Sequence, residues 1–215
     1  MIVDSHLHVW VQKPDQYPWQ PIGGYTPENE APVEKYLELM DAEGVDRAVL
    51  VQPTPYGWDN SYLLDSSAVY PDRFRSVCLV DPLSQGAAER LADLVAKGVN
   101  GLRINWHLQP AEVWDENSDH LELWQRAQDL DIPICLQMTP EYIWLVRKMA
   151  INYSGVKIVM DHLGRPNRGC SPGDAAFQSL LKLSQYPNLY IKLSGMNYYS
   201  QDEAPYPDTW PLLQA

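Results

Sequence analysis

The sequence predicts an α/β fold and, within that class, a (β/α)8 TIM barrel. Short runs rich in Val, Ile and Leu alternate with helix-like stretches. The resulting strand–helix unit recurs roughly every 25 to 45 residues, as in sheets of parallel strands. In addition, polar residues gather where the apolar runs end, which is where such a barrel carries its chemistry.

Near-continuous apolar runs are typical of parallel strands that are buried on both faces. Seven strands are expected: Ile2–Val9, Ala48–Gln52, Arg75–Val80, Gly101–Ile104, Ile132–Gln137, Val156–Met160 and Leu189–Leu193. The helices expected between them are about Pro32–Glu43, Asn60–Tyr70, Ser84–Lys97, Asp119–Leu130, Pro140–Asn152 and Gly173–Gln185. Ser84 is expected to cap its helix and Gly98 to end it. A further helix is expected to begin near Asp208.

Parallel units in this number fit either a closed barrel or a doubly wound sheet. No G-x-G-x-x-G turn follows the first strand, so the usual mark of a dinucleotide-binding sheet is missing. The barrel is therefore favoured.

Length and charge set limits on partners and location. The 215 residues are expected to form one domain over positions 1–215. A net charge of −12 without a basic stripe argues against nucleic acid and anionic membranes as partners. Three cysteines without metal-ligand spacing, and an N-terminus without a secretory pattern, predict a cytoplasmic location. A small-molecule substrate is expected, and a homo-oligomer is left open.

The strongest local motif is Asp4-Ser5-His6-Leu7-His8. Residues two apart in a strand face the same way, so His6 and His8 are expected to point together into the barrel. Two such imidazoles can share a metal ion or polarise a carbonyl. The alternative is a pair of core histidines satisfied by their neighbours.

The second motif is the strand Val156–Met160 followed by Asp161-His162-Leu163-Gly164-Arg165-Pro166. His162 is expected at the strand mouth. Arg165, on the loop that follows, can hold an anionic substrate through two hydrogen bonds. The alternative for Arg165 is a surface salt bridge of little energetic weight.

These motifs resemble the amidohydrolase-related group of the amidohydrolase superfamily. The matching stretches are D-S-H-L-H-V-W, G-L-R, D-H-L-G-R-P and N-L-Y-I-K-L-S-G. That group includes 2-pyrone-4,6-dicarboxylate lactonase and sugar lactonases of the L-fuconolactonase type. The resemblance implies a metal-dependent-hydrolase barrel that opens a lactone by water attack on the ester carbonyl.

The resemblance also implies roles for individual residues. The catalytic set is His6, His8, Arg103 and His162, and the substrate-binding set is Gln137, Arg165, Lys192 and Trp106. His6 and His8 would bind a metal, with His162 as a third ligand. Gln137 stands where many members have a metal-binding His, so at most one divalent ion is expected. Zinc is favoured, and a site without metal is the alternative.

A second departure from the group concerns the end of the barrel. The resemblance implies an eighth strand ending in a water-activating Asp, and no such motif occurs in the sequence. The barrel is therefore expected to be truncated after its seventh strand, and the 215-residue chain to be inactive and poorly soluble by itself. Two other functions stay open: a zinc-dependent decarboxylase of the same superfamily, and an inactive fragment or non-catalytic binding remnant.

Overall fold

The structure is a computed structural model that describes residues 1–23 and 26–215. The chain divides into two compact units, residues 1–103 and residues 104–215, called the first and the second unit below. Each is described by itself. The expectation of a single domain stays a prediction.

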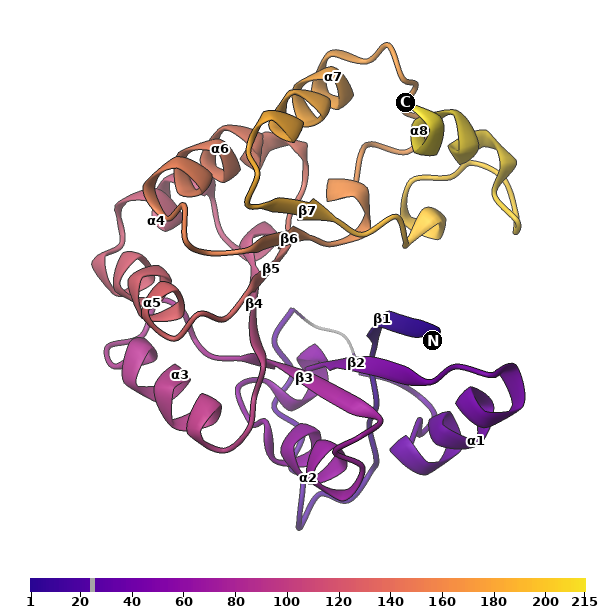
Figure 1. Ribbon diagram of the computed structural model, residues 1–215, viewed down its shortest axis with the longest axis vertical. Helices are drawn as coiled ribbons and strands as arrows, with labels where there is room; N and C mark the ends of the chain where they lie inside the picture. Colours follow the sequence, from indigo (N-terminus) through magenta and orange to yellow (C-terminus); the bar gives the residue numbers. More distant parts are fainter. Residues whose placement is uncertain (24–25) are drawn as a thin grey trace. The chain divides into compact units, whose positions relative to one another are not determined.

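Parallel strands and intervening helices build the first unit. Its strands are β1 (Val3–Leu7), β2 (Arg47–Val51), β3 (Phe74–Leu79) and the beginning of β4 (Gly101–Asn105). Its helices are α1 (Val33–Glu43), α2 (Ser61–Val69) and α3 (Ala87–Ala96), with a 3-10 turn η1 (Thr54–Tyr56). Every strand pairs in parallel with the next one along the chain, so all four end at the same edge (Figure 1).

Burial explains why these segments form strands. Leu50, Cys78 and Leu102 are fully buried at the centre of β2, β3 and β4. Each such aliphatic side chain contributes roughly 1.5–3 kcal/mol of transfer free energy. Where β1 pairs with β2, the register shifts by one residue between Asp4 and Leu7, which is a bulge just before the end of the strand.

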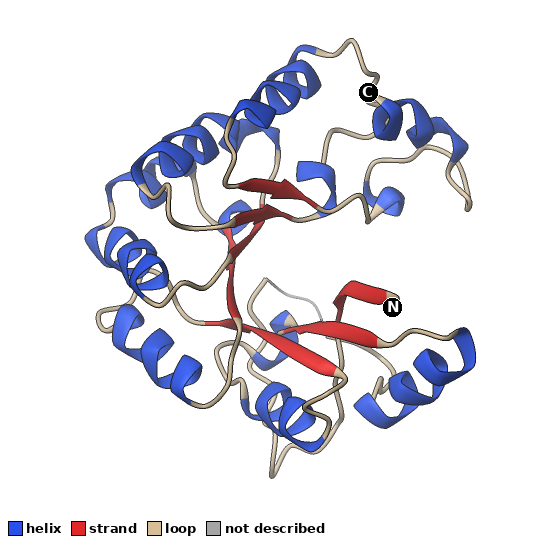
Figure 2. Ribbon diagram, in the orientation of Figure 1, coloured by secondary structure: helices blue, strands red, loops and turns tan. Residues whose placement is uncertain are grey.

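The second unit repeats this alternation (Figure 2). Its strands β5 (Ile134–Gln137), β6 (Ile158–Met160) and β7 (Leu189–Ile191) are parallel and paired in order. Its helices are α4 (Ala111–Glu116), α5 (Ser118–Asp129), α6 (Ile143–Asn152), α7 (Ala175–Leu181) and α8 (Trp210–Gln214). Its 3-10 turns are η2 (Trp106–Leu108), η3 (Pro140–Tyr142), η4 (His162–Gly164), η5 (Lys182–Gln185), η6 (Met196–Tyr198) and η7 (Pro207–Thr209).

The seven expected strands and six expected helices are all present, each within a few residues of its predicted bounds. Cys78 and Cys135 are both buried. Among the described residues, no helix is both long and apolar enough to cross a bilayer.

Three local predictions were wrong. Ser84 does not cap α3; Gly86 occupies the N-cap position, and the Ser84 hydroxyl donates to the Asp81 carbonyl instead. Helix α4 was missed because its six residues are too few to show a period. The predicted helices Pro140–Asn152 and Gly173–Gln185 each consist partly of α-helix and partly of a 3-10 turn.

Candidate functional site

In the first unit, β1 ends in two histidines whose reactive nitrogens face each other. His6 Nε2 lies 3.3 Å from His8 Nε2, and the two rings meet edge to face. Both side chains are half-buried. The prediction that the two imidazoles point the same way is therefore confirmed.

Backbone contacts orient both rings. His8 Nδ1 lies 2.7 Å from the carbonyl oxygen of Val51 on β2, so this nitrogen carries the proton and Nε2 presents its lone pair. The Asp4 carboxylate accepts hydrogen bonds from the backbone N–H of His6 at 3.0 Å and from the Tyr36 hydroxyl at 2.7 Å. Burial and the neighbouring Asp4 raise the pKa of Tyr36, so it remains a donor. These contacts hold the backbone of β1 in place just before His6.

The histidine pair fits a metal ion. Two nitrogens each about 2.0–2.1 Å from a tetrahedral ion lie roughly 3.3–3.4 Å apart, which is the separation found here. A ligating His commonly donates its other N–H to a backbone carbonyl, as His8 does to Val51. The pair therefore has the spacing of two ligands of one ion.

Other polar residues lie at the same edge of the first unit. Arg103 on β4 is 3% exposed and pairs in register with Leu79 on β3. The Asn60 side chain bonds both the N–H and the carbonyl of Leu79, at 3.0 and 2.8 Å, and so ties the start of α2 to the end of β3. Gln52, which follows β2, is buried and donates to the Asp59 carbonyl.

In the second unit, β6 and β7 end in a buried ion pair. Lys192 Nζ lies 3.0 Å from Asp161 Oδ1, and the two side chains are 9% and 0% exposed. Burying a charge costs several kcal/mol, and pairing with an opposite charge offsets that cost. Each of the two residues therefore stabilises the charged form of the other in this position. The backbone supports this register, because the Lys192 N–H donates to the Met160 carbonyl at 2.9 Å.

His162 follows Asp161 and is held on two sides. Its Nδ1 lies 3.0 Å from Ser194 Oγ, and the Tyr198 ring packs against it with centroids 5.3 Å apart. The central carbon of the Arg165 guanidinium lies over the Tyr198 ring, 4.7 Å from its centroid. Ser194 was not among the predicted site residues.

The turn after β6 has an unusual backbone. His162, Leu163 and Arg165 all have φ between 46° and 56°, a left-handed region that costs non-glycine residues energy. Strain of this kind persists where the surrounding structure enforces it, and it clusters at functional sites. The absence of a side chain at Gly195 leaves room for the His162 ring, because a Cβ placed there would lie 2.7 Å from His162 Nδ1.

Two predicted residues lie at the end of β4 and β5 in this unit. Gln137 is half-buried, and its carbonyl oxygen lies 3.4 Å from His107 Nδ1. Trp106 is fully buried and donates its indole N–H to His120 Nε2 at 3.2 Å. That arrangement gives Trp106 a packing role in the core.

His120 is structural, because both of its ring nitrogens lie within hydrogen-bond distance of tryptophan groups. Its Nε2 also accepts the Trp124 indole N–H at 2.9 Å, and its Nδ1 lies 2.6 Å from the Trp114 carbonyl. Burial lowers the pKa of His120 to about 4, so the ring is neutral at neutral pH.

Asn105, at the C-terminal end of β4, is a residue that the sequence argument did not select. It is 4% exposed, and neither amide atom of its side chain finds a hydrogen-bond partner among the described residues. Buried amides without partners are rare in native proteins and call for a ligand or a water. The signal in the sequence was its place directly after a strand.

The chain was compared with known proteins. The family model described as Amidohydrolase matches residues 3–215. A 4-sulfomuconolactone hydrolase of Rhizobium radiobacter is 29% identical over 99% of this chain and 69% of its own length. A probable 2-pyrone-4,6-dicarboxylic acid hydrolase of Acinetobacter baumannii, solved with citric acid bound, has a TM-score of 0.84 at 24% identity, over 99% of this chain and 76% of its own.

A third comparison concerns metal. A zinc-bound amidohydrolase of Burkholderia multivorans has a TM-score of 0.75 at 21% identity, over 100% of this chain and 77% of its own. These likenesses confirm the predicted α/β barrel fold. With the family match over nearly its whole length, the chain belongs to the amidohydrolase family.

Proposed function

We propose that this protein hydrolyses a lactone of a small carboxylic acid, by attack of water on the ester carbonyl. The observation that carries the proposal is the 3.3 Å approach of His6 Nε2 and His8 Nε2. It occurs in a chain that matches a lactone hydrolase along 99% of its residues.

His6 and His8 would hold one divalent ion, with zinc as the first choice. A bound ion of this kind acts as a Lewis acid on the carbonyl and lowers the pKa of water. The zinc in the Burkholderia multivorans protein supports this choice. The roles of His162 as a third ligand and of Gln137 in limiting the site to one ion stay predictions.

The remaining polar groups are assigned from their surroundings. His162 Nδ1 lies 3.0 Å from Ser194 Oγ, and in the tautomer that donates Nδ1–H to this hydroxyl, Nε2 would accept a proton or bind the ion. Arg103 and Lys192 are cations held in low-exposure positions, suited to stabilising negative charge that develops on the carbonyl oxygen.

We further assign an anionic substrate. Arg165 lies over the Tyr198 ring, which restricts the guanidinium plane and favours bidentate binding of a carboxylate. Citric acid, a tricarboxylate, is bound in the Acinetobacter baumannii structure, which supports a carboxylate-binding role for the family fold. The unpaired amide of Asn105 would bind a further oxygen of the substrate.

The test is a ring-opening assay on a panel of 2-pyrone-4,6-dicarboxylate, 4-sulfomuconolactone, an uncharged sugar lactone and a benzoate-type acid. Both the 215-residue chain and the full product of its gene are assayed, because the chain spans 69% of the Rhizobium radiobacter enzyme. Opening of the anionic lactones ahead of the sugar lactone supports the proposal.

Release of carbon dioxide from the benzoate-type acid without ring opening would establish the decarboxylase instead. Binding without turnover, in the full gene product, would favour the non-catalytic alternative. The cytoplasmic location is proposed with the function, because the sequence has an odd number of cysteines, three, and no pair with metal-ligand spacing.

A further inference from the structure

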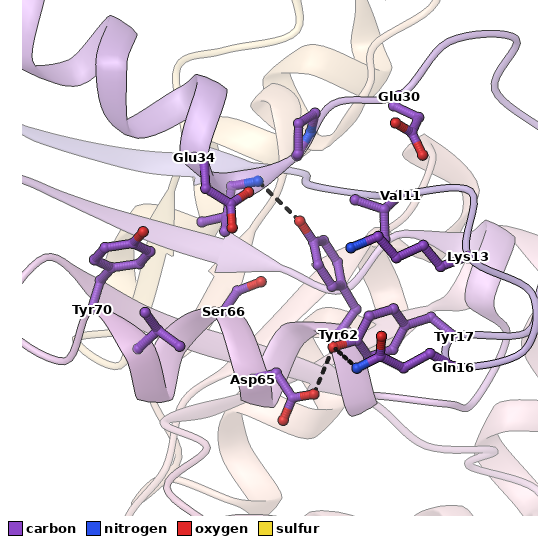
Figure 3. A pocket seen from close by; sticks show the side chains of 13 residues that line it. Val11, Lys13, Gln16, Tyr17, Glu30, Glu34, Tyr62, Asp65, Ser66 and Tyr70 are labelled. Atoms are coloured by element: carbon purple, nitrogen blue, oxygen red, sulfur yellow. Dashed lines mark hydrogen bonds between the residues drawn. The ribbon is translucent and has the colours of Figure 1, made fainter.

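A cavity of about 350 Å³ lies in the first unit, away from the histidine pair (Figure 3). It is formed by the segment that follows β1 and by the beginning of α1 and one side of α2. Its volume is within the range of small-molecule pockets, roughly 300–1,000 Å³. Nothing in the lactonase proposal uses it.

Aromatic and aliphatic side chains make its walls. Tyr17 and Tyr62 meet edge to face with centroids 5.0 Å apart, and Val33 and Val69 also line the cavity. The Tyr62 hydroxyl accepts the Val33 N–H at 3.0 Å, which fixes the ring in place. These surfaces suit the carbon chain of a small ligand, and tyrosine faces attract cations.

The charged lining is acidic. The cavity is lined by one basic residue, Lys13, and by three acidic residues, Glu30, Glu34 and Asp65. The formal charges of these four side chains sum to −2. The Tyr17 hydroxyl donates to Asp65 Oδ2 at 2.8 Å. Burial and Asp65 raise the pKa of Tyr17 to about 12, so Tyr17 stays neutral and remains a donor to Asp65. A cation is therefore the ligand that this lining favours.

A buried hydroxyl points to a hydrogen-bonding ligand. Ser66 is 3% exposed, and its Oγ, which lies near the Tyr62 hydroxyl, completes no hydrogen bond of normal geometry among residues 1–23 and 26–215. Figure 3 shows this hydroxyl directed into the cavity toward Tyr62. An unmet buried polar atom costs about 1–3 kcal/mol, which a ligand N–H would relieve.

The three carboxylates do not gather as the ligands of one metal ion would. In the described residues, Glu30, Glu34 and Asp65 do not form a group whose oxygens all lie within 4.8 Å of one another. An ion that carries its own hydrogen-bond donors and an apolar body fits better.

We propose that this cavity binds a small aliphatic amine. Its ammonium group is held by the carboxylates of Glu34 and Asp65 and donates to Ser66 Oγ. Its carbon chain lies against Tyr62 and the two valines. Any role in regulation would be independent of the lactonase chemistry.

Isothermal titration of the protein with 1,4-diaminobutane, butylamine, butyrate, 1-butanol and calcium chloride tests the proposal. The two amines are expected to bind, and to bind at least tenfold more tightly than the alcohol or the acid. Ser66→Ala, which removes only a buried hydroxyl and should fold, is expected to weaken amine binding about threefold to tenfold. Glu34→Gln and Asp65→Asn should each weaken it as well, and less so at high salt.

The matched control is Glu38→Gln. Glu38 lies on the same helix as Glu34, is exposed and does not line the cavity, so its loss removes the same charge. If Glu38→Gln weakens binding as much as Glu34→Gln, only the overall charge matters and the site is refuted. The proposal also fails if butyrate, butanol or calcium binds as tightly as the amines, or if no amine binds.

Discussion

Lys192 and Asp161 form an ion pair of 3.0 Å in which the carboxylate is wholly buried and the lysine side chain is 9% exposed. Lys192 follows β7 and Asp161 follows β6, and Asp161 directly precedes His162 in the sequence. A pair so deeply buried is costly to break by removing one partner, because the other charge is left without compensation.

We expect Lys192→Met to destabilise the protein by about 3–5 kcal/mol. The double variant Lys192→Met/Asp161→Asn should recover part of that loss, because no bare charge is left. Urea unfolding of the wild type, both single variants and the double variant gives the coupling between them. Additive effects of the two changes would mean that the pair contributes nothing to the fold.

Ser194→Ala is expected to lower kcat about tenfold to 100-fold, because an outer hydrogen bond of this type orients a catalytic or ligating His. KM should change little, since Ser194 is assigned no contact with substrate. Ser184→Ala, an exposed serine in the same unit, serves as the control. An unchanged kcat would leave the 3.0 Å contact with His162 without a catalytic role.

Metal binding should depend on the β1 histidines. We expect at most one zinc equivalent per chain, and His6→Asn or His8→Asn should weaken binding by at least tenfold. Competition with a chromophoric chelator measures the affinity without reference to activity. His107→Asn is the matched control, because His107 is not assigned as a ligand. Two tightly held equivalents would contradict the single-ion site.

Much of the fold was readable from the sequence because its strands are runs of Val, Ile and Leu. Burial of those runs leaves few alternatives, as the fully buried Leu50 and Leu102 show. The shared direction of His6 and His8 also followed from the two-residue period of a strand.

Contacts between distant segments could not be read in the same way. Ser194 and His162 meet across 32 residues, and only the register of β6 and β7 brings them together. Trp106 was placed in the substrate-binding set from the sequence. Its partner His120, 14 residues away, draws it into the core instead.

Stability should fall in mild acid because of His120. Burial lowers its folded pKa to about 4 from 6.5, so the unfolded chain binds more protons between those values. The stabilisation is thus complete above pH 6.5 and is lost as pH falls toward 4, about 2 kcal/mol of it between pH 7 and 5. Urea unfolding at both pH values should show a smaller difference for His120→Gln. If the wild type and His120→Gln lose the same free energy of unfolding between the two pH values, other groups cause the loss of stability in acid.

Gly195 and Gly44 offer a matched test of how His162 is held. Both have nearly the same backbone conformation, with φ of 67° and 69°, so alanine at either position carries a similar cost of about 1 kcal/mol. Their surroundings differ. A Cβ at Gly44 meets nothing within 4 Å, whereas one at Gly195 would lie 2.7 Å from His162 Nδ1. Gly195→Ala must therefore displace the His162 ring from Ser194. We expect it to lose most lactonase activity while Gly44→Ala keeps it, with both variants folded in urea titrations. Equal activity in the two variants would show that the position of His162 is not what the reaction requires.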